Sequence, residues 1–202
     1  MNYKLVFIDD HMREGVNDPF VRPIGKKNKD AEISVFLDPA EGLQYIMDNL
    51  NSRMIVFIDR KFDGYTLQGI NLLKEIRKTT SLLYIVMMSV SPLTEIPETD
   101  IQEMINEDYI SFFNRNTGTI DEACRLIQKV KDIWYSRFDC ILEAWLVRHP
   151  EEANKQAYTE ACRSYTWKDI LSELRMQTPA GKGMEQMVNE YYMFHFGEEK
   201  DK

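Results

Sequence analysis

Short runs of consecutive apolar residues recur along the first two thirds of the chain, and each run stops at a polar residue. Runs of this length are typical of strands that are buried on both faces of a parallel sheet. The first run, Leu5-Val6-Phe7-Ile8, is followed at once by two aspartates. The pattern predicts five strands, at residues 5–8, 32–37, 54–58, 82–88 and 109–113.

Apolar residues at helical spacing occupy most of the segments between these runs. Asp38-Pro39-Ala40-Glu41 predicts a helix start, because Asp38 suits the N-cap and Pro39 suits the first helical position. The segment His11–Ala31 contains two prolines and two glycines, so we expect a short turn of helix and an extended loop there. Further helices are expected at residues 70–78, 99–106 (with Thr99 as the cap) and 119–134.

Strand and helix alternate five times up to residue 138, which predicts a doubly wound α/β domain with a parallel sheet. No strand pattern is found beyond that point, and we expect an all-α extension of four helices there. Within the extension, Glu151–Tyr165 is expected to be the second helix, and Thr166 is expected to cap the third. The predicted domains are therefore 1–138 and 139–202.

Polar residues that suit a metal site follow three of the predicted strands. Asp9 and Asp10 follow the first strand, Asp59 follows the third, and Ser89 follows the fourth. In an open parallel sheet, ligands bind at the carboxyl ends of the strands, which meet at one edge. Three carboxylates gathered at that edge repel one another, and a hard divalent cation such as Mg²⁺ neutralises them. The sequence therefore predicts a weak Mg²⁺ site that includes the three aspartates.

Composition narrows the classes of function. The chain has 202 residues and a formal net charge of −8, so we expect it to bind no nucleic acid. No apolar stretch approaches the ~18 residues of a membrane span and no secretory signal is present, which favours a cytoplasmic protein without membrane contact. The scattered histidines are expected to be ordinary surface or core residues, and the cysteines to be buried thiols: Cys124, Cys140 and Cys162.

Over roughly residues 3–136, the chain resembles the receiver domains of bacterial two-component response regulators. The resemblance rests on the acidic pair after the first strand, the aspartate after the third, the hydroxyl after the fourth and Tyr109 in the fifth. It implies a flavodoxin-like sheet with the order 2-1-3-4-5, in which Asp59 is the phosphoacceptor and Ser89 binds a phosphoryl oxygen. It also implies that Mg²⁺ is held by four groups, which are the carboxylates of Asp9, Asp10 and Asp59 and the backbone carbonyl of Lys61.

Simpler roles remain open for several of these residues. Tyr109 matches the aromatic residue that changes rotamer in the family, but an ordinary core position explains it equally well. Asp9 could cap the turn after its strand, and Ser89 could satisfy a loop amide.

The chain also departs from the family pattern. Three residues after Tyr109, where the family has a phosphoryl-binding lysine, this chain has Phe112, followed by Phe113 in place of the usual proline. Arg115 is the nearest cation and could substitute for the lysine if the loop after the fifth strand turns inward. The segment that replaces the first helix also differs from the surface on which kinases commonly dock.

These features favour a signalling module of the phosphorelay type, with no enzymatic activity of its own, that is coupled to a helical protein-interaction tail. The expected partners are a histidine kinase or another signalling protein, and a homodimer is a further candidate. The alternative is a phosphorylation-independent pseudo-receiver that acts as a scaffold. A phosphatase of the haloacid dehalogenase type is disfavoured, because Asp9-Asp10-His11 lacks the Asp-x-Asp motif. The tail's aromatic residues could form its core or a docking surface: Trp145, Trp167, Tyr191, Tyr192, Phe194 and Phe196.

Overall fold

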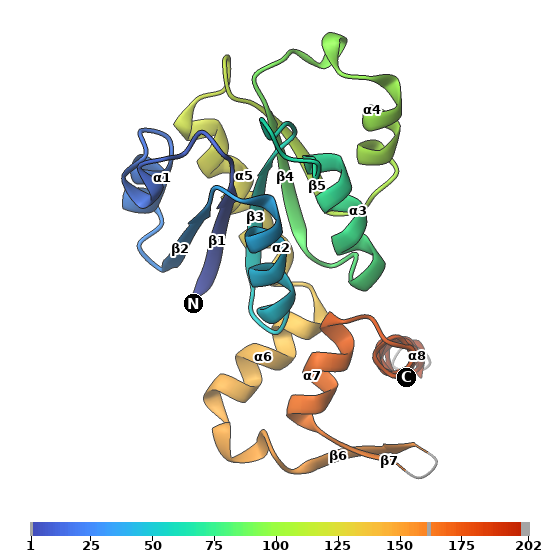
Figure 1. Ribbon diagram of the computed structural model, residues 1–202. Helices are drawn as coiled ribbons and strands as arrows, with labels where there is room; N and C mark the ends of the chain where they lie inside the picture. The colour runs from blue at the N-terminus through green and yellow to red at the C-terminus, as the bar shows by residue number, and fades with distance from the viewer. Residues whose placement is uncertain (1, 161–162, 199–202) are drawn as a thin grey trace. The chain divides into compact units, whose positions relative to one another are not determined.

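The computed structural model describes residues 2–160 and 163–198 (Figure 1), so Cys162 lies outside the described residues. The chain divides into two compact units, Met1–Ile133 and Trp134–Lys202. Each unit has its own cluster of buried apolar side chains.

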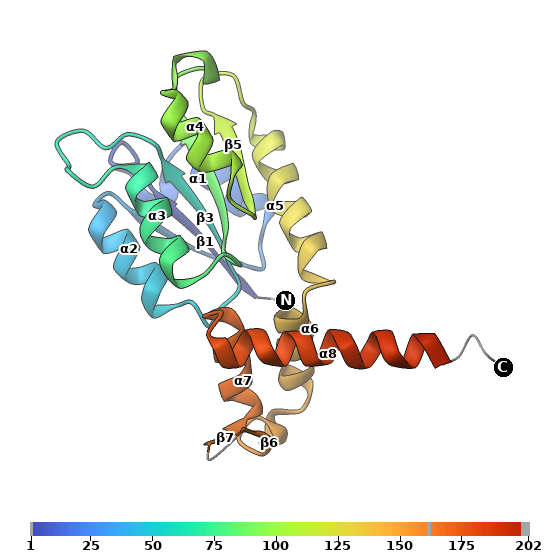
Figure 2. The same ribbon diagram turned by 90° about the vertical axis from the view of Figure 1, so that its right-hand side faces the viewer.

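The first unit is built on a five-stranded parallel sheet with the order β2-β1-β3-β4-β5 (Figures 1 and 2). This order confirms the flavodoxin-like topology that the resemblance implies. Adjacent strands pair in parallel throughout, so all five carboxyl ends meet at one edge. The strands are β1 (Tyr3–Ile8), β2 (Ala31–Phe36), β3 (Met54–Asp59), β4 (Tyr84–Ser89) and β5 (Ile110–Asn114).

Helices cover both faces of this sheet, with α2, α3 and α4 on one face and α1 and α5 on the other (Figure 2). Every residue of β3 and β4 is therefore buried, as their continuous apolar runs predict. Asp38 caps α2 as predicted, because its carboxylate accepts hydrogen bonds from the N–H groups of Ala40 and Glu41. The helices are α1 (Val21–Lys27), α2 (Pro39–Asp48), α3 (Gly69–Thr79), α4 (Glu98–Ile105) and α5 (Ile120–Trp134).

Two local predictions in the first unit need correction. The segment after β1 forms a 3-10 turn at Gly15–Asn17 and then the seven-residue helix α1, where we expected one short turn and a loop. Pro23 is compatible with α1 because it lies in the first turn, where the backbone N–H has no partner within the helix. The helix α4 begins at Glu98 after Pro97, so the prediction that Thr99 caps it is wrong.

The long helix α5 reaches only the first residue of the second unit. It ends at Trp134, and α6 (Phe138–Arg148) begins only after Tyr135, Ser136 and Arg137. Arg137 has an extended backbone conformation, which marks the start of a separate helix.

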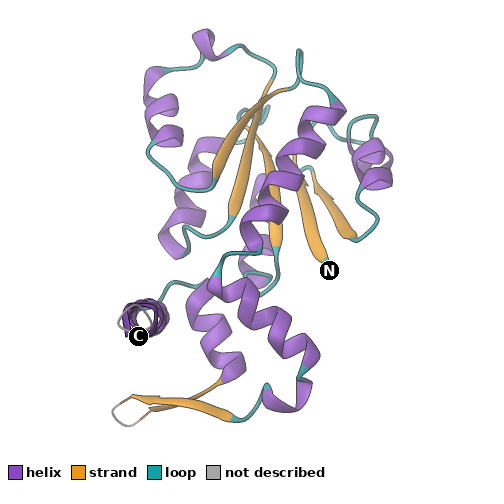
Figure 3. Cartoon of the chain, turned by 180° about the vertical axis from the view of Figure 1, so that it is seen from behind, coloured by secondary structure: helices purple, strands orange, loops and turns teal. Residues whose placement is uncertain are grey.

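The second unit combines helices with a hairpin (Figure 3). Strands β6 (Gln156–Glu160) and β7 (Arg163–Thr166) pair in an antiparallel sheet, so the predicted helix at Glu151–Tyr165 is wrong and the extension is not all-α. Tyr158 lies opposite Tyr165, and such aromatic cross-strand pairs stabilise a sheet. Thr166 caps α7 (Trp167–Arg175) in a capping box, as predicted, and α8 (Pro179–Glu198) follows.

The aromatic residues of the second unit divide between its core and its surface. Trp145 and Trp167 pack against a core of Leu142, Tyr165, Ile170 and Leu174, with their ring centroids 5.3 Å apart. On α8, by contrast, three rings are exposed, and they belong to Tyr191, Tyr192 and Phe194. The side chain of Phe196 lies outside the described residues.

A buried ion pair also stabilises the second unit. Asp139 is 5% exposed and accepts hydrogen bonds from Arg137 Nε at 2.9 Å and from Arg175 Nε at 3.2 Å. Burial acts to raise the pKa of Asp139, but the two guanidinium groups outweigh it and hold that pKa below its usual range.

Candidate functional site

The carboxyl edge of the sheet brings the predicted site residues together. In the register, Ile8 pairs with Ile58, so Asp9 and Asp59 follow adjacent residues of two neighbouring strands. Asp59 pairs with Met88, and Ser89 is the next residue of β4. Asp9 is fully buried, and Asp59 is 8% exposed. The burial of these two carboxylates follows from their position at the ends of strands that helices cover on both faces.

Backbone amides orient three of the polar side chains. Asp9 Oδ1 accepts a hydrogen bond from the N–H of His11 at 2.8 Å, and Asp10 Oδ2 accepts one from the N–H of Asp63 at 3.0 Å. Ser89 Oγ accepts one from the N–H of Ser91 at 3.1 Å. The Asp9 and Ser89 bonds are short-range turns, so the simpler roles that the sequence left open for these two residues are met in this structure.

Arg115 reaches the acidic residues from the end of β5. Its backbone N–H donates to the carbonyl of Ser89 at 2.8 Å, which holds the start of the loop against the end of β4. Its guanidinium then forms an ion pair with the carboxylate of Asp9. The loop after the fifth strand therefore does turn inward, but the cation contacts Asp9 and not Asp59.

The surroundings of Asp59 disfavour the charged form of its carboxyl group. Burial, and then the charge of Asp9, raise the pKa of Asp59 from 3.8 to about 7, although Arg115 opposes this rise. Burial also raises the pKa of Asp9, again against the effect of Arg115. Two carboxylates that both resist ionisation at one sheet edge are favourable partners for a further positive charge.

The side chains present fit a divalent cation. Asp9, Asp10, His11 and Asp59 each offer a ligand atom, and these atoms all lie within 4.8 Å of one another. Asp10 Oδ1 is buried and has no hydrogen-bond partner among the described residues, which leaves it available for coordination. Lys61 lies in the loop directly after β3, and its carbonyl stays a predicted ligand.

A close approach of α3 fixes the end of β3. The N–H of Gly69 donates to the carbonyl of Arg60 at 3.1 Å. A Cβ atom at Gly69 would lie only 2.2 Å from the carbonyl oxygen of Asp59, so only glycine fits at this position.

Two residues lie elsewhere than the sequence suggested. Tyr109 precedes β5 with a φ of 54°, and its ring lies 6.5 Å from that of Tyr84, the first residue of β4. It is therefore at the amino end of the sheet, opposite the carboxylates, and it does not line the site. Phe112, which occupies the position of the family's lysine, packs against the core. The cation that reaches the site is Arg115, three residues later.

His11 lies beside the carboxylates, although its residue type and spacing had suggested no role for it. Its Nδ1 is 3.2 Å from Asp10 Oδ1. The one signal in the sequence was its position directly after the acidic pair.

Among the described residues, no helix is both long and apolar enough to cross a membrane.

The first unit is similar to solved receiver domains. A response-regulator receiver-domain protein from Clostridium thermocellum is 21% identical, with a TM-score of 0.51 over 63% of this chain and 93% of that one. The receiver domain of NtrX from Brucella abortus is 22% identical, with a TM-score of 0.47 over 66% of this chain and 99% of that one. Vibrio cholerae CheY4 is 16% identical, with a TM-score of 0.48 over 64% of this chain and 99% of that one.

No protein-family model and no curated protein matches the chain. At the identities of the solved structures, the likeness establishes the fold alone. The first unit of this chain has the fold of a response-regulator receiver domain, with an acidic cluster at the carboxyl end of its sheet.

Proposed function

We propose that the chain is a receiver-like signalling module in which Asp59 accepts a phosphoryl group. The observation that carries this proposal is the clustering of ligand atoms from Asp9, Asp10 and Asp59 within 4.8 Å at the carboxyl edge of the sheet. A carboxylate oxygen of Asp59 attacks the phosphorus of a phosphohistidine or an acyl phosphate. The new P–O bond forms an acyl phosphate on Asp59, the bond to the donor breaks, and the donor keeps that electron pair.

The surrounding residues prepare this step. When bound by the three carboxylates and the carbonyl of Lys61, Mg²⁺ supplies positive charge to the transferring phosphoryl group. Ser89, at the end of β4, donates its hydroxyl hydrogen to a phosphoryl oxygen. Arg115 brings a guanidinium to the same edge, where it substitutes for the missing lysine. Burial of Asp59 limits the access of water to the acyl phosphate.

Two observations favour the pseudo-receiver as a second candidate. The Arg115 guanidinium pairs with Asp9, the neighbour of the phosphoacceptor, and not with the phosphoacceptor itself. A pKa of about 7 also leaves much of Asp59 protonated near neutral pH, and a protonated carboxyl is a poor nucleophile. In this second candidate the same unit acts as a scaffold without phosphorylation.

Labelling with radioactive acetyl phosphate in the presence of Mg²⁺ tests the proposal on the full chain. We expect slow labelling of the wild type, none of Asp59→Asn, and unchanged labelling of Asp48→Asn, because Asp48 lies at the end of α2, away from the carboxyl edge of the sheet. Labelling that survives in Asp59→Asn would contradict the assignment of the phosphoacceptor. A wild type that stays unlabelled over hours would favour the scaffold.

We further propose that the second unit binds protein partners, such as a histidine kinase, another signalling protein or a second copy of the chain. Residues 139–202 contain eight basic and twelve acidic residues, which disfavours binding to a polyanion. The exposed rings of Tyr191, Tyr192 and Phe194 are of the types enriched in protein interfaces. A gel-shift series at low salt is expected to show no binding to duplex DNA, and tight, salt-sensitive binding would contradict this part of the proposal.

A further inference from the structure

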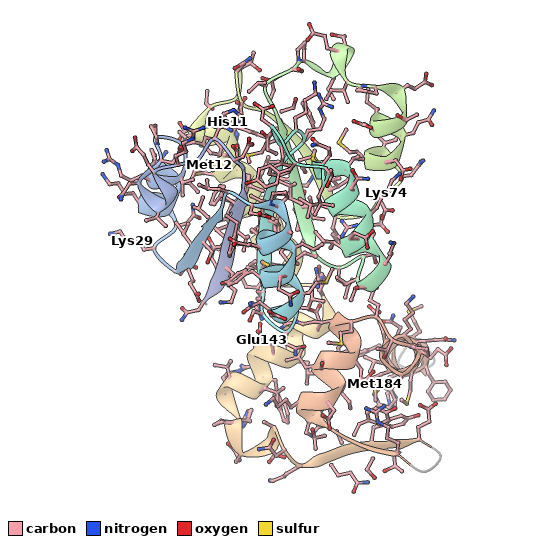
Figure 4. All side chains as sticks on the ribbon, viewed as in Figure 1. His11, Met12, Lys29, Lys74, Glu143 and Met184 are labelled. Atoms are coloured by element: carbon pink, nitrogen blue, oxygen red, sulfur yellow. The ribbon has the colours of Figure 1, made fainter. Side chains whose placement is uncertain are left out.

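His11 lies at the mouth of the acidic cluster, at the end of the sheet where Figure 4 labels it. Its Nδ1 is 3.2 Å from Asp10 Oδ1 and 3.8 Å from Asp9 Oδ1, so this nitrogen faces the carboxylates. Its Nε2 is 3.5 Å from Asp63 Oδ2 on the other side of the ring. The two ring nitrogens therefore have different surroundings, one toward the cluster and one toward the loop after β3.

Two carboxylates in the cluster favour a further positive charge nearby: Asp59, which is buried, and Asp10, whose side chain is 11% exposed. Asp59 is 8% exposed and ends β3 next to the point where the fully buried Asp9 follows β1, so two carboxylates lie in one poorly solvated place. Asp10 Oδ1 is buried without a hydrogen-bond partner among the described residues, although it lies closest to the imidazole. Buried carboxylate oxygens are costly when unsatisfied, and both residues place a ligand oxygen within 4.8 Å of a ring nitrogen of His11.

We propose that His11 Nδ1 is a ligand of the cation at this site, and that the site therefore prefers a first-row transition metal such as Mn²⁺ to Mg²⁺. The inference rests on the proposed function, because it uses the same carboxylates, and it adds the identity of the metal. A site of oxygen ligands alone suits Mg²⁺, which dehydrates reluctantly. An imidazole nitrogen strengthens the binding of first-row transition metals, with the smallest gain for Mn²⁺, and it adds little for Mg²⁺, so Mn²⁺ is the most stringent of these metals as a probe.

Asp63 supplies the support that a metal-bound histidine needs. Metal-bound histidines commonly donate their second N–H to a carboxylate, which fixes the tautomer and the orientation of the ring. With its hydrogen on Nε2, His11 donates toward Asp63 Oδ2 and presents the lone pair of Nδ1 to the cluster. The backbone N–H of Asp63 also donates to Asp10 Oδ2, so one loop residue holds both His11 and Asp10 in place.

Metal titrations on the full chain separate this role from a plain ion pair between His11 and the aspartates. Mn²⁺ binding is followed by electron paramagnetic resonance, and Mg²⁺ binding by its competition with Mn²⁺. We expect His11→Ala to weaken Mn²⁺ binding by about tenfold, while Mg²⁺ binding changes by less than about twofold. His149→Ala is the matched control, because His149 Nδ1 lies 3.6 Å from Glu151 in the second unit, and it should change neither affinity.

A spectroscopic signature tests direct contact. Electron spin-echo modulation of bound Mn²⁺ should show a coupled imidazole nitrogen in the wild type and in His149→Ala, and none in His11→Ala. Equal weakening of both metals, or the same nitrogen signal in His11→Ala, would overturn the inference.

None of these measurements uses a phosphodonor. If Asp59 is labelled, but the ratio of Mn²⁺ affinity to Mg²⁺ affinity is the same in the wild type and in His11→Ala, the proposed function stands and the role of His11 is refuted. If that ratio falls in His11→Ala, but Asp59 is never labelled, the role of His11 stands and the proposed function is refuted.

Discussion

Replacing Asp59 by asparagine should stabilise the protein at pH 8 when divalent cations are absent. Burial, and then the charge of Asp9, raise the pKa of Asp59 from 3.8 to about 7. The folded state therefore binds the proton more tightly than the unfolded state does. Between about pH 4 and pH 7 the unfolded state loses this proton while the folded state keeps it, so the free energy of unfolding falls as the pH rises. Above pH 7 both states are ionised and the loss is complete.

The size of the effect follows from the pKa difference. About three pKa units at 1.36 kcal/mol each give a loss of about 4 kcal/mol at pH 8. The substituted asparagine would carry no charge, but its amide would still be desolvated at the same position, which offsets part of the gain. We therefore expect Asp59→Asn to be about 2–4 kcal/mol more stable than the wild type at pH 8, with a smaller difference at pH 5.

Urea unfolding in EDTA, followed by far-ultraviolet circular dichroism at pH 5 and pH 8, measures this difference. Tryptophan fluorescence in a Trp134→Phe background serves as an internal control, because Trp134 ends α5 of the first unit, whereas Trp145 and Trp167 lie within the second unit and should report little change. Asp48→Asn removes the same charge from the end of α2 and should have no comparable effect that depends on pH. A stability difference between Asp59→Asn and the wild type that stays constant from pH 5 to pH 8 would refute the reasoning.

Four further substitutions, one of them a control, test the contacts around the site and in the second unit. Arg115→Ala removes the cation from the buried carboxylate of Asp9 and should cost about 2 kcal/mol at pH 8 by urea unfolding; an unchanged midpoint would show that the ion pair contributes nothing. Asp139→Asn should destabilise the second unit by about 3–5 kcal/mol, read by tryptophan fluorescence. Because the pKa of Asp139 is depressed, its contribution should be present above about pH 4 and lost as the pH falls further; a loss toward alkaline pH would contradict this assignment. Gly181→Ala should weaken the packing of α8 on α7, because its Cβ would lie 2.1 Å from the backbone oxygen of Glu173. Gly183→Ala has open space around it and should stabilise α8 by about 0.5–1 kcal/mol. Equal unfolding midpoints for the two variants would argue against the close approach at Gly181.

The sheet and its acidic edge could be predicted because they depend on local patterns. The central strands are buried on both faces, so their apolar runs are continuous, and a parallel sheet places every strand's carboxyl end at one edge. Because the ends of β1, β3 and β4 were predicted correctly, the clustering of Asp9, Asp59 and Ser89 was predicted correctly too.

The predictions that were wrong near the site concern residues whose positions depend on where a strand ends and how the next loop turns. The spacing counted from Tyr109 placed the lysine position at Phe112, but β5 continues to Asn114 before Arg115 turns toward Asp9. The spacing of apolar residues does not show how far a strand continues beyond its last apolar residue. His11 was missed for a related reason, since only the turn after β1 brings its ring back over the carboxylates.

The prediction of a helix in place of the β6–β7 hairpin was wrong for a different reason. Tyr158, Tyr165 and Thr166 have strand propensity, but the segment is short and half exposed, so it lacks the apolar run that marked the buried strands. In such segments, cross-strand pairing decides the structure, and the partner strand cannot be identified from periodicity.

Gly69 has a consequence for tracing the ancestry of this chain. Its lack of a side chain is demanded by the carbonyl of Asp59, a backbone atom that is present whatever residue occupies position 59. Under the proposed function, a descendant that abandoned phosphorylation would be free to change Asp59, Ser89 or Arg115, yet it would still need glycine at position 69 as long as α3 meets β3 in this way. In a lineage drifting from switch to scaffold, this glycine should therefore outlast the acidic residues and provide a more durable marker for aligning distant relatives.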